Sequence, residues 1–294
     1  MSIDPPQIRD VTGDPSGGTG EVPADHVPVV RRVKFDYADV PVHWVDGAPM
    51  VTHVANAFNV LLPPGERMFC RTFREALPRV EDGLLRDQVK AFIAQEAIHG
   101  RSHHGYIEHL AEEGWPVDRL MASFDRRAEF LDTRVPLKLR LWLIASIEIY
   151  TAMLAGYAFD TGLFDDAHPE MRDLFLWHLA EEAEHKSVAH DLASAIDPSR
   201  VRQMVAGVIV FVGIVLQPAL VMVRLLRWDP EMNVRRSVRE LWRERGQLIE
   251  LARRGVRSFR ASLRRDFHPS QIPDPPAALA YFADSPAVAS LAAR

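Results

Sequence analysis

The chain has almost no cysteine: Cys70 is the only one among its 294 residues. A single cysteine excludes an intramolecular disulfide and any zinc site built from several thiolates, and it fits a reducing compartment. We therefore expect a cytoplasmic protein. Because Cys70 falls in an apolar helical stretch, its expected role is inert packing.

Several motifs of nucleophilic and nucleotide chemistry are also missing. The sequence contains no G-x-S-x-G, no Walker loop and no dinucleotide-binding glycine fingerprint. Alternation of apolar and polar residues, the sign of a half-buried strand, is confined to a short extended stretch around residues 33–44. These absences remove the common α/β enzyme classes and predict an all-α protein.

Both ends of the chain have little apolar pattern. Residues 1–30 are rich in proline, glycine and aspartate and lack an apolar run after a basic start, so we expect an unpacked lead-in and no signal peptide. Residues 271–294 are rich in proline and alanine and are expected to form a loose tail. Between them we expect a metal-binding bundle at residues 31–200 and additional C-terminal helices at 201–270.

Helical periodicity accounts for most of the region in between. A polar helix is expected near residues 118–131, between long helices that begin at prolines or end at glycines. The long helices are expected from Pro63-Pro64 to just before Pro78, from 84 to 113, from Pro136 to 159, and from near Pro169 to 196. Four long helices with short or moderate connections predict a four-helix bundle.

Two of the long helices carry a Glu-x-x-His pair among apolar residues. One pair is Glu96 with His99, and the other is Glu182 with His185. The helical spacing of their apolar neighbours turns both pairs toward the core. Burial of such charges costs about several kcal/mol per ion unless an opposite charge compensates them. A bound metal ion supplies that charge; the alternative is structural histidines with buried ion pairs.

The other two long helices each offer one inward acid. These are Glu66 in the first and Glu148 in the third. One Glu from each of two helices and a Glu-x-x-His from each of two others is the ligand pattern of ferritin-like dinuclear carboxylate sites. The sequence thus predicts a ferritin-like bundle whose metal ligands are Glu66, Glu96, His99, Glu148, Glu182 and His185.

Four carboxylates and two imidazoles form a hard, oxygen-rich donor set. Such a set suits iron or manganese, whereas structural zinc prefers cysteine and histidine. We expect two iron ions, with manganese as the alternative. His103 and His178 each lie one turn from a predicted ligand, as further ligands, supports for a ligand or proton carriers. Together with Tyr106 they are the candidate catalytic side chains.

Five stretches resemble a known family. They read "PPGERMF", "QEAIHGRSHHGY", "EIYTAM", "HLAEEAEHKSVAHDL" and "RRDFHP". Together they look like the bacterial proteins described as predicted metal-dependent hydrolases, over roughly residues 30–270. The resemblance implies a metal enzyme with a ferritin-like bundle, and the family's name implies hydrolysis.

The ligand set and the family's name point to different reactions. Four glutamates and two histidines favour O2-dependent oxidation of an organic substrate by a di-iron site, which is our first interpretation. The alternative is hydrolysis, in which a metal-activated water attacks a carbonyl or phosphoryl group. A third interpretation is a bundle that stores or carries metal.

Residues 204–223 form a twenty-residue apolar run whose only polar side chain is Gln217. The run is long enough for a membrane span, but we favour a helix that is buried, lies in a homo-oligomer interface or inserts peripherally into the inner membrane. Thirteen Arg against five Asp or Glu follow in residues 224–265. They predict attraction to anionic lipid rather than nucleic acid, because stacking aromatics are not interleaved with them. An apolar wall beside the site would suit a small hydrophobic substrate.

Overall fold

The computed structural model describes residues 25–284, and most of these residues are helical. In this range there is no β-strand, only an isolated bridge between Val45 and Ala167, and the stretch 33–44 is a loop that pairs with no strand. The all-α class is confirmed. The helices are α1 Pro49–Ala76, α2 Gly83–Glu112, α3 Val117–Arg134, α4 Leu137–Thr161, α5 Pro169–His185, α6 Val188–Ile196, α7 Arg200–Trp228, α8 Val234–Arg243, α9 Arg245–Ser262 and α10 Pro276–Asp284.

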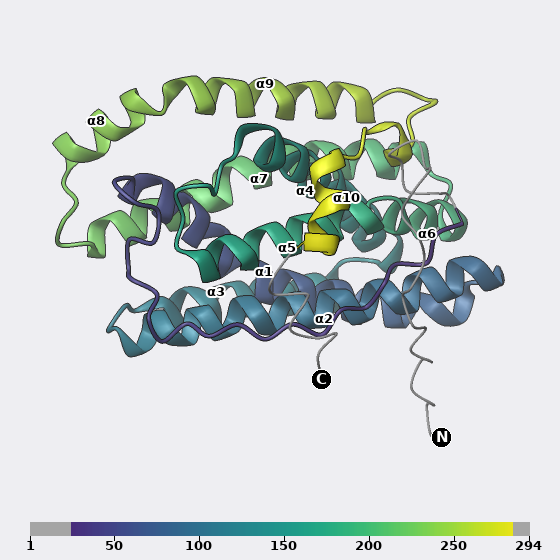
Figure 1. Ribbon diagram of the computed structural model, residues 1–294. Coiled ribbons are helices and arrows are strands. Elements are labelled where there is room, and N and C mark those ends of the chain that lie inside the picture. Colours follow the sequence, from purple (N-terminus) through teal and green to yellow (C-terminus); the bar gives the residue numbers. More distant parts are fainter. Residues whose placement is uncertain (1–24, 285–294) are drawn as a thin grey trace.

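The central arrangement is a bundle of α1, α2, α4 and α5. Helix α1 packs against α2 and α4, and α5 packs against α2 and α4, so that the four enclose a common interior. The remaining helices cover this bundle: α3 lies on α1, α7 lies on α1 and α4, and α9 lies on α4. Figure 1 shows α8 and α9 as a long outer layer along one edge of the molecule.

Helix ends follow local sequence signals. The carboxylate of Asp82 accepts a hydrogen bond of 2.8 Å from the Leu85 amide and so caps the first turn of α2. Gly162 ends α4 with a φ of +61°, a left-handed conformation that favours glycine. These two signals fix the ends of the two helices that are predicted most accurately.

The expected start of the first helix is wrong. Helix α1 begins at Pro49 and runs through Pro63 and Pro64, which lie inside it. The apolar pattern continues upstream, where Ala57 and Val60 are fully buried, and this burial outweighs the loss of two helical N–H donors at the prolines.

The fourth long helix is interrupted, against expectation. A turn at residues 186–187 separates α5 from α6 directly after His185. The side chain of Lys186 is buried there, and it donates to the Ile272 carbonyl and pairs with Asp274. The turn therefore brings a lysine from the middle of a helix to a partner in the C-terminal segment.

Both ends of the described chain are more ordered than expected. Residues 276–284 were expected in the loose tail but form α10, which packs against α5, with Ala278 fully buried. Residues 25–30 of the expected lead-in lie along the bundle, where the backbone carbonyls of His26 and Val29 accept hydrogen bonds from α2 side chains. The expectations for residues 1–24 and 285–294 lie outside the described residues.

Helices α4 and α7 are both long and apolar enough to cross a membrane by length and composition alone. In α4, 72% of the most apolar window is buried, as in a core helix. In α7 only 28% is buried, so the interpretation of residues 204–223 as a buried helix is wrong within this chain. The α7 surface is largely open to solvent.

Candidate metal centre

The bundle interior holds all six predicted donors. Helix α1 supplies Glu66, α2 supplies Glu96 and His99, α4 supplies Glu148, and α5 supplies Glu182 and His185. Each of them is at most 2% exposed. A spacing of three residues puts both members of each Glu-x-x-His pair on one helix face, and the two faces are turned to the same interior.

One half of the centre gathers around His185. Its Nε2 lies 3.5 Å from Glu96 Oε1, 3.4 Å from Glu148 Oε2 and 3.3 Å from Glu182 Oε2. These separations are longer than hydrogen bonds and fit donor atoms that share one metal ion at bonds of about 2.0–2.2 Å.

The other half gathers around His99. Its Nδ1 lies 3.9 Å from Glu96 Oε1 and 3.8 Å from Glu182 Oε1. Donor atoms of Glu66, His99 and His178 form a further group within 4.8 Å of one another. Glu96 and Glu182 face both histidines and thus stand between the two halves.

The donor atoms lack hydrogen-bond partners. Among the described residues, buried atoms without a partner include both carboxylate oxygens of three glutamates and the inward nitrogens of two histidines. They are Oε1 and Oε2 of Glu66, Glu96 and Glu148, Oε2 of Glu182, Nδ1 of His99 and Nε2 of His185. A buried carboxylate without hydrogen-bond donors is costly. Each of the six predicted ligands has at least one such unsatisfied atom, and this observation fits a bound cation.

The charge balance also fits a cation. Burial, together with the neighbouring carboxylates, raises the pKa of Glu66, Glu96 and Glu148 well above the ordinary value. Burial and nearby imidazoles lower the pKa of His99 well below its ordinary value, so this ring is neutral and its nitrogen is free to bind metal. Without a cation, the acids therefore repel one another in a water-poor interior.

Outer hydrogen bonds orient both histidines that are predicted ligands. His99 Nε2 lies 2.9 Å from Glu181 Oε2, so this nitrogen is the one engaged by Glu181, and Nδ1 is left facing the centre. His185 Nδ1 lies 3.1 Å from Gln95 Oε1. The amide nitrogen of Gln95 donates to Val29 O and to a Glu184 oxygen, so its oxygen faces His185 and leaves His185 Nε2 free.

A network beyond these bonds ties the N-terminal segment to the centre. Arg31 Nη1 lies 3.1 Å from Glu181 Oε1 and 2.8 Å from Glu184 Oε2. Burial raises the pKa of Glu181 to about 8, and the positive charge of Arg31 opposes that rise. The carboxylate behind His99 is thus held by a residue 150 positions earlier in the chain.

His103 and His178 form a buried pair next to the donors. His178 Nε2 lies 2.8 Å from Glu182 Oε1 and 3.9 Å from Glu66 Oε1. His103 Nε2 lies 2.6 Å from His178 Nδ1, and its other nitrogen lies 2.6 Å from Asn59 Oδ1. His178 therefore borders the centre, whereas His103 reaches it only through His178.

Tyr106, the third candidate catalytic residue, lies apart from the donors. It is fully buried and packs with its ring against Tyr37 at 5.6 Å and His109 at 6.1 Å. Burial raises the pKa of its hydroxyl beyond that of free tyrosine. Among the described contacts, none joins Tyr106 to a predicted ligand.

Apolar side chains enclose the centre on two sides. The ring of Phe92 lies 4.5 Å from that of His185, and the Trp177 ring lies 4.9 Å from that of His99. Phe92 and Trp177 belong to two different apolar clusters. The polar centre thus lies between two hydrophobic cores.

Two other groups of histidine and aspartate have a different geometry. In one, Asp229 Oδ2 lies 2.7 Å from Nε2 of both His43 and His53. In the other, His268 Nε2 lies 2.8 Å from Asp191 Oδ1. These are hydrogen-bond distances, so in both groups the carboxylate is already paired with imidazole, although His53 Nδ1 and His190 Nδ1 have no hydrogen-bond partner in the described part of the chain. Among the described residues, buried carboxylate oxygens without a partner occur only in the six-residue centre.

Sequence reasoning did not find Arg31, Asn59 or Gln95. Glu181 and Gln95 directly precede Glu182 and Glu96, which is a local signal for a polar residue behind the ligand face. Arg31 and Asn59 have no such signal, because their roles depend on where the loop and α1 dock.

A comparison with protein families gives a match over most of the chain. The family model described as a predicted metal-dependent hydrolase matches residues 29–272. The matched region contains every residue of the centre and of the network around it. Neither the curated proteins nor the solved structures include a match to this chain.

Proposed function

Because the chain belongs to the family of predicted metal-dependent hydrolases, we propose that it is a hydrolase with two metal ions held between α1, α2, α4 and α5. The observation that carries the proposal is the set of unsatisfied donor atoms in Glu66, Glu96, Glu148, Glu182 and the two histidines. One Glu from each of α1 and α4 and a Glu-x-x-His from each of α2 and α5 is the ferritin-like arrangement, which supports a dinuclear site.

The six residues would divide between the two ions. Glu148 and His185 would hold one ion, and Glu66 and His99 would hold the other, while Glu96 and Glu182 face both halves. His178 Nε2, directed at Glu66 and Glu182, is a further ligand candidate for the second half. When bound, the metal ions supply Lewis-acid chemistry, since they polarise a substrate oxygen and lower the pKa of a water.

The protein's own groups would handle protons and substrate. His178 Nε2 faces the Glu182 carboxylate beside the centre, and its Nδ1 contacts His103 Nε2, so the pair could carry a proton between the centre and Asn59. Glu181 and Gln95 hold the ligand histidines in the required tautomers. The apolar surroundings of Phe92 and Trp177 exclude water and suit a small hydrophobic substrate.

Two observations favour a second candidate, O2-dependent oxidation. The donor set of four carboxylates and two imidazoles is hard and oxygen-rich, which suits iron or manganese. In addition, the donors are almost fully buried, and O2 is small and apolar enough to reach such a site. This candidate would use the same six ligands.

Anaerobic assays separate the two candidates. Protein loaded with zinc, manganese or ferrous iron is mixed with p-nitrophenyl esters and phosphoesters without O2, and O2 uptake by the ferrous form is measured separately. Hydrolysis that is lost in Glu96→Gln and retained in Glu112→Gln, an exposed residue of the same helix, supports the proposal. O2 uptake dependent on Glu96, without hydrolysis of any probe, would replace hydrolysis with oxidation.

A further inference from the structure

The outward face of α7 is apolar over its whole length. Its exposed side chains recur every three or four residues, and polar positions interrupt them only near the helix ends. They are Val201, Met204, Val205, Val208, Ile209, Val212, Val215, Leu216, Leu220 and Val223. At 1.5 Å per residue this stripe is about 33 Å long. Such a large exposed apolar surface marks an interaction site.

Helix α8 has the opposite orientation from an ordinary surface helix. Val234, Val238 and Trp242 are 82%, 60% and 69% exposed, whereas Glu240 faces inward and is buried. Glu240 accepts a hydrogen bond of 2.9 Å from the Met50 amide and one of 3.0 Å from Arg236. The apolar side chains of α8 therefore point outward, and a charged residue occupies its inner face.

Helices α7 and α9 are neighbours. The rings of Phe211 on α7 and Phe259 on α9 stack at 4.3 Å, and both helices pack on α4. Helix α9 continues the outward apolar pattern of α8 with Leu248, Ile249 and Val256. Exposed apolar side chains thus occur on three helices that are linked by contacts of α9 with both α7 and α8.

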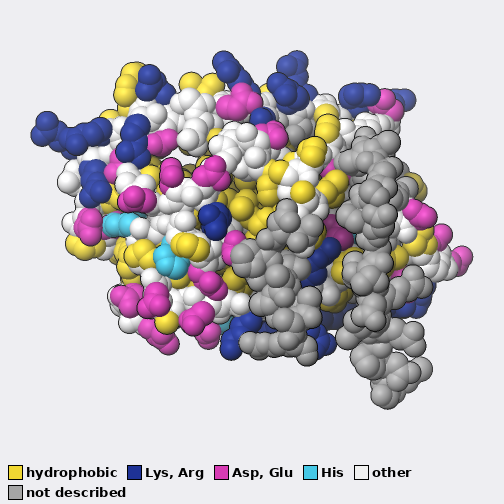
Figure 2. All heavy atoms as spheres, in the orientation of Figure 1, with side chains coloured by type: hydrophobic (Ala, Val, Ile, Leu, Met, Phe, Trp, Pro, Cys, Tyr) yellow, Lys and Arg dark blue, Asp and Glu magenta, His cyan; other side chains and the backbone are white. Residues whose placement is uncertain are grey.

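Arginines border these stripes. Residues 224–265 contain thirteen Arg and five acidic residues, and Arg235, Arg239, Arg253 and Arg257 are all exposed. Figure 2 shows Lys and Arg side chains along the edge where Figure 1 places α8 and α9, with hydrophobic side chains between them. Apolar residues flanked by arginine are the composition of helices that lie in the interface of an anionic bilayer.

We propose that α7, α8 and α9 form a membrane-docking surface that inserts its apolar side chains into the headgroup region of an anionic lipid bilayer. The inner face of α7, with Ala206, Val210, Val221 and Leu225, packs on the bundle, so α7 lies in the membrane plane and does not span it. A second copy of the chain fits less well, because a symmetric contact would bring two arginine-rich segments together.

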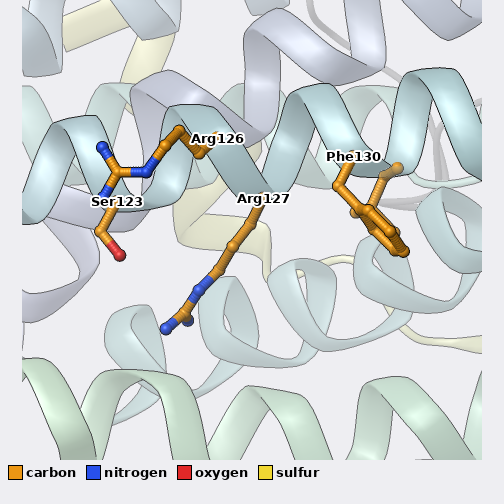
Figure 3. A pocket seen from close by; sticks show the side chains of 5 residues that line it. Ser123, Arg126, Arg127 and Phe130 are labelled. Atoms are coloured by element: carbon orange, nitrogen blue, oxygen red, sulfur yellow. The ribbon is translucent and has the colours of Figure 1, made fainter.

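A depression beside α7 adds to this surface. It measures about 460 Å³ and is lined by Ser123, Arg126, Arg127, Phe130 and Leu131. In Figure 3 Arg127 extends from α3 toward a neighbouring helix, and its Nη1 lies 2.5 Å from Gln217 Oε1 of α7. Two guanidinium groups beside an exposed phenylalanine match a lipid phosphate and its acyl chain, and they place such a headgroup at the edge of the α7 stripe.

Vesicle sedimentation tests the proposal. The full chain is mixed at low salt with vesicles of phosphatidylglycerol and phosphatidylcholine, or of phosphatidylcholine alone. We expect binding to the anionic vesicles and at least tenfold weaker binding to the neutral ones. Salt at about 0.5 M should release part of the bound protein, because it screens the attraction between arginine and the anionic headgroups. Replacing Arg235, Arg239, Arg253 and Arg257 by Glu should reduce anionic binding at least tenfold. Val212→Glu with Val215→Glu should reduce it at all salt concentrations.

Matched substitutions on α2 provide the control. Leu84 and Arg101 are also exposed, so Leu84→Glu and Arg101→Glu change the same residue types on a different helix and should leave binding unchanged. Thermal unfolding of all variants should agree with the wild type within about 2 °C. Absence of vesicle binding, or equal binding to both vesicle types, would overturn the proposal. A lipid-free dimer that Val212→Glu dissociates, without vesicle binding, would assign the surface to a second copy.

Discussion

Gly100 on α2 lies so close to Glu66 on α1 that a side chain at this position would meet the carboxylate. A Cβ atom on Gly100 would stand 3.0 Å from Glu66 Oε2 and 3.9 Å from Pro63 Cα. Gly100 is one residue after the predicted ligand His99, and both residues face the interior of the bundle. The absence of a side chain at residue 100 thus gives Glu66 the room it occupies.

Gly100→Ala should therefore weaken metal binding without weakening the fold. The new methyl group displaces the Glu66 carboxylate, while alanine stabilises a helix by up to about 1 kcal/mol relative to glycine. We expect affinity for one of two metal ions to fall about tenfold or more. Gly156→Ala, in a helical position with no atom within 4 Å of the added Cβ, should leave metal binding unchanged. Metal titration and thermal unfolding measure both effects, and unaltered binding in Gly100→Ala would argue against Glu66 as a ligand.

Glu148→Gln should have effects of opposite sign with and without metal. In the metal-free protein Glu148 is fully buried, and its carboxylate lacks hydrogen-bond donors. A neutral side chain of the same shape removes this cost, so the metal-free variant should be more stable than the wild type by about 1–3 kcal/mol. With metal, the variant should be the less stable of the two. Urea unfolding with and without a chelator measures both differences; lower stability of the variant in both states would contradict a metal role.

Arg31→Ala should impair the centre from outside it. The side chain of Arg31 is 14% exposed and contacts the almost fully buried carboxylates of Glu181 and Glu184. Removing it leaves these two acids without their cation and loosens the carboxylate that orients His99. We expect a loss of about 3 kcal/mol of folding stability and a ten- to about hundredfold loss of metal affinity. Urea unfolding measures the first loss and metal titration the second. Arg32→Ala, at the exposed neighbouring position, is the control and should match the wild type in both measurements.

Asp229 should make stability dependent on pH. Burial opposes its ionisation, but hydrogen bonds from His53 and His43 outweigh burial and lower its pKa. A carboxyl group with a lowered pKa stabilises the fold above its unfolded pKa of about 4, and that contribution is lost as the pH falls further. Asp229→Asn should therefore cost about 1–3 kcal/mol at pH 7 and progressively less below pH 4. A difference in unfolding free energy that stays constant from pH 7 to pH 3 would contradict this account.

The helix class and the six interior donors could be predicted because both depend on local periodicity. Glu96 and His99, three residues apart among apolar residues, must share the inward face of any helix that contains them. The same rule applies to Glu182 and His185. Their convergence follows once the two helices pack in one bundle.

The start of α1 and the turn after His185 depended on tertiary contacts that periodicity does not contain. Proline at residues 63 and 64 is a valid signal for a helix start, but burial of Ala57 and Val60 extends the helix upstream. Lys186 leaves the helix because its partner Asp274 comes from a segment almost ninety residues later. For the same reason no local pattern indicated that Arg31 supports Glu181.

The nearly complete burial of the six donors has a kinetic consequence. A metal ion held by these six donors would be covered by the side chains around it, so its release would be coupled to local opening of the helices, as the entry of a substrate would be. Its release rate would then report how often the bundle opens, on the slow timescale of local unfolding rather than of ligand exchange at a surface. The rate of metal exchange, followed with an isotope, would thus measure the rate of local opening in this core.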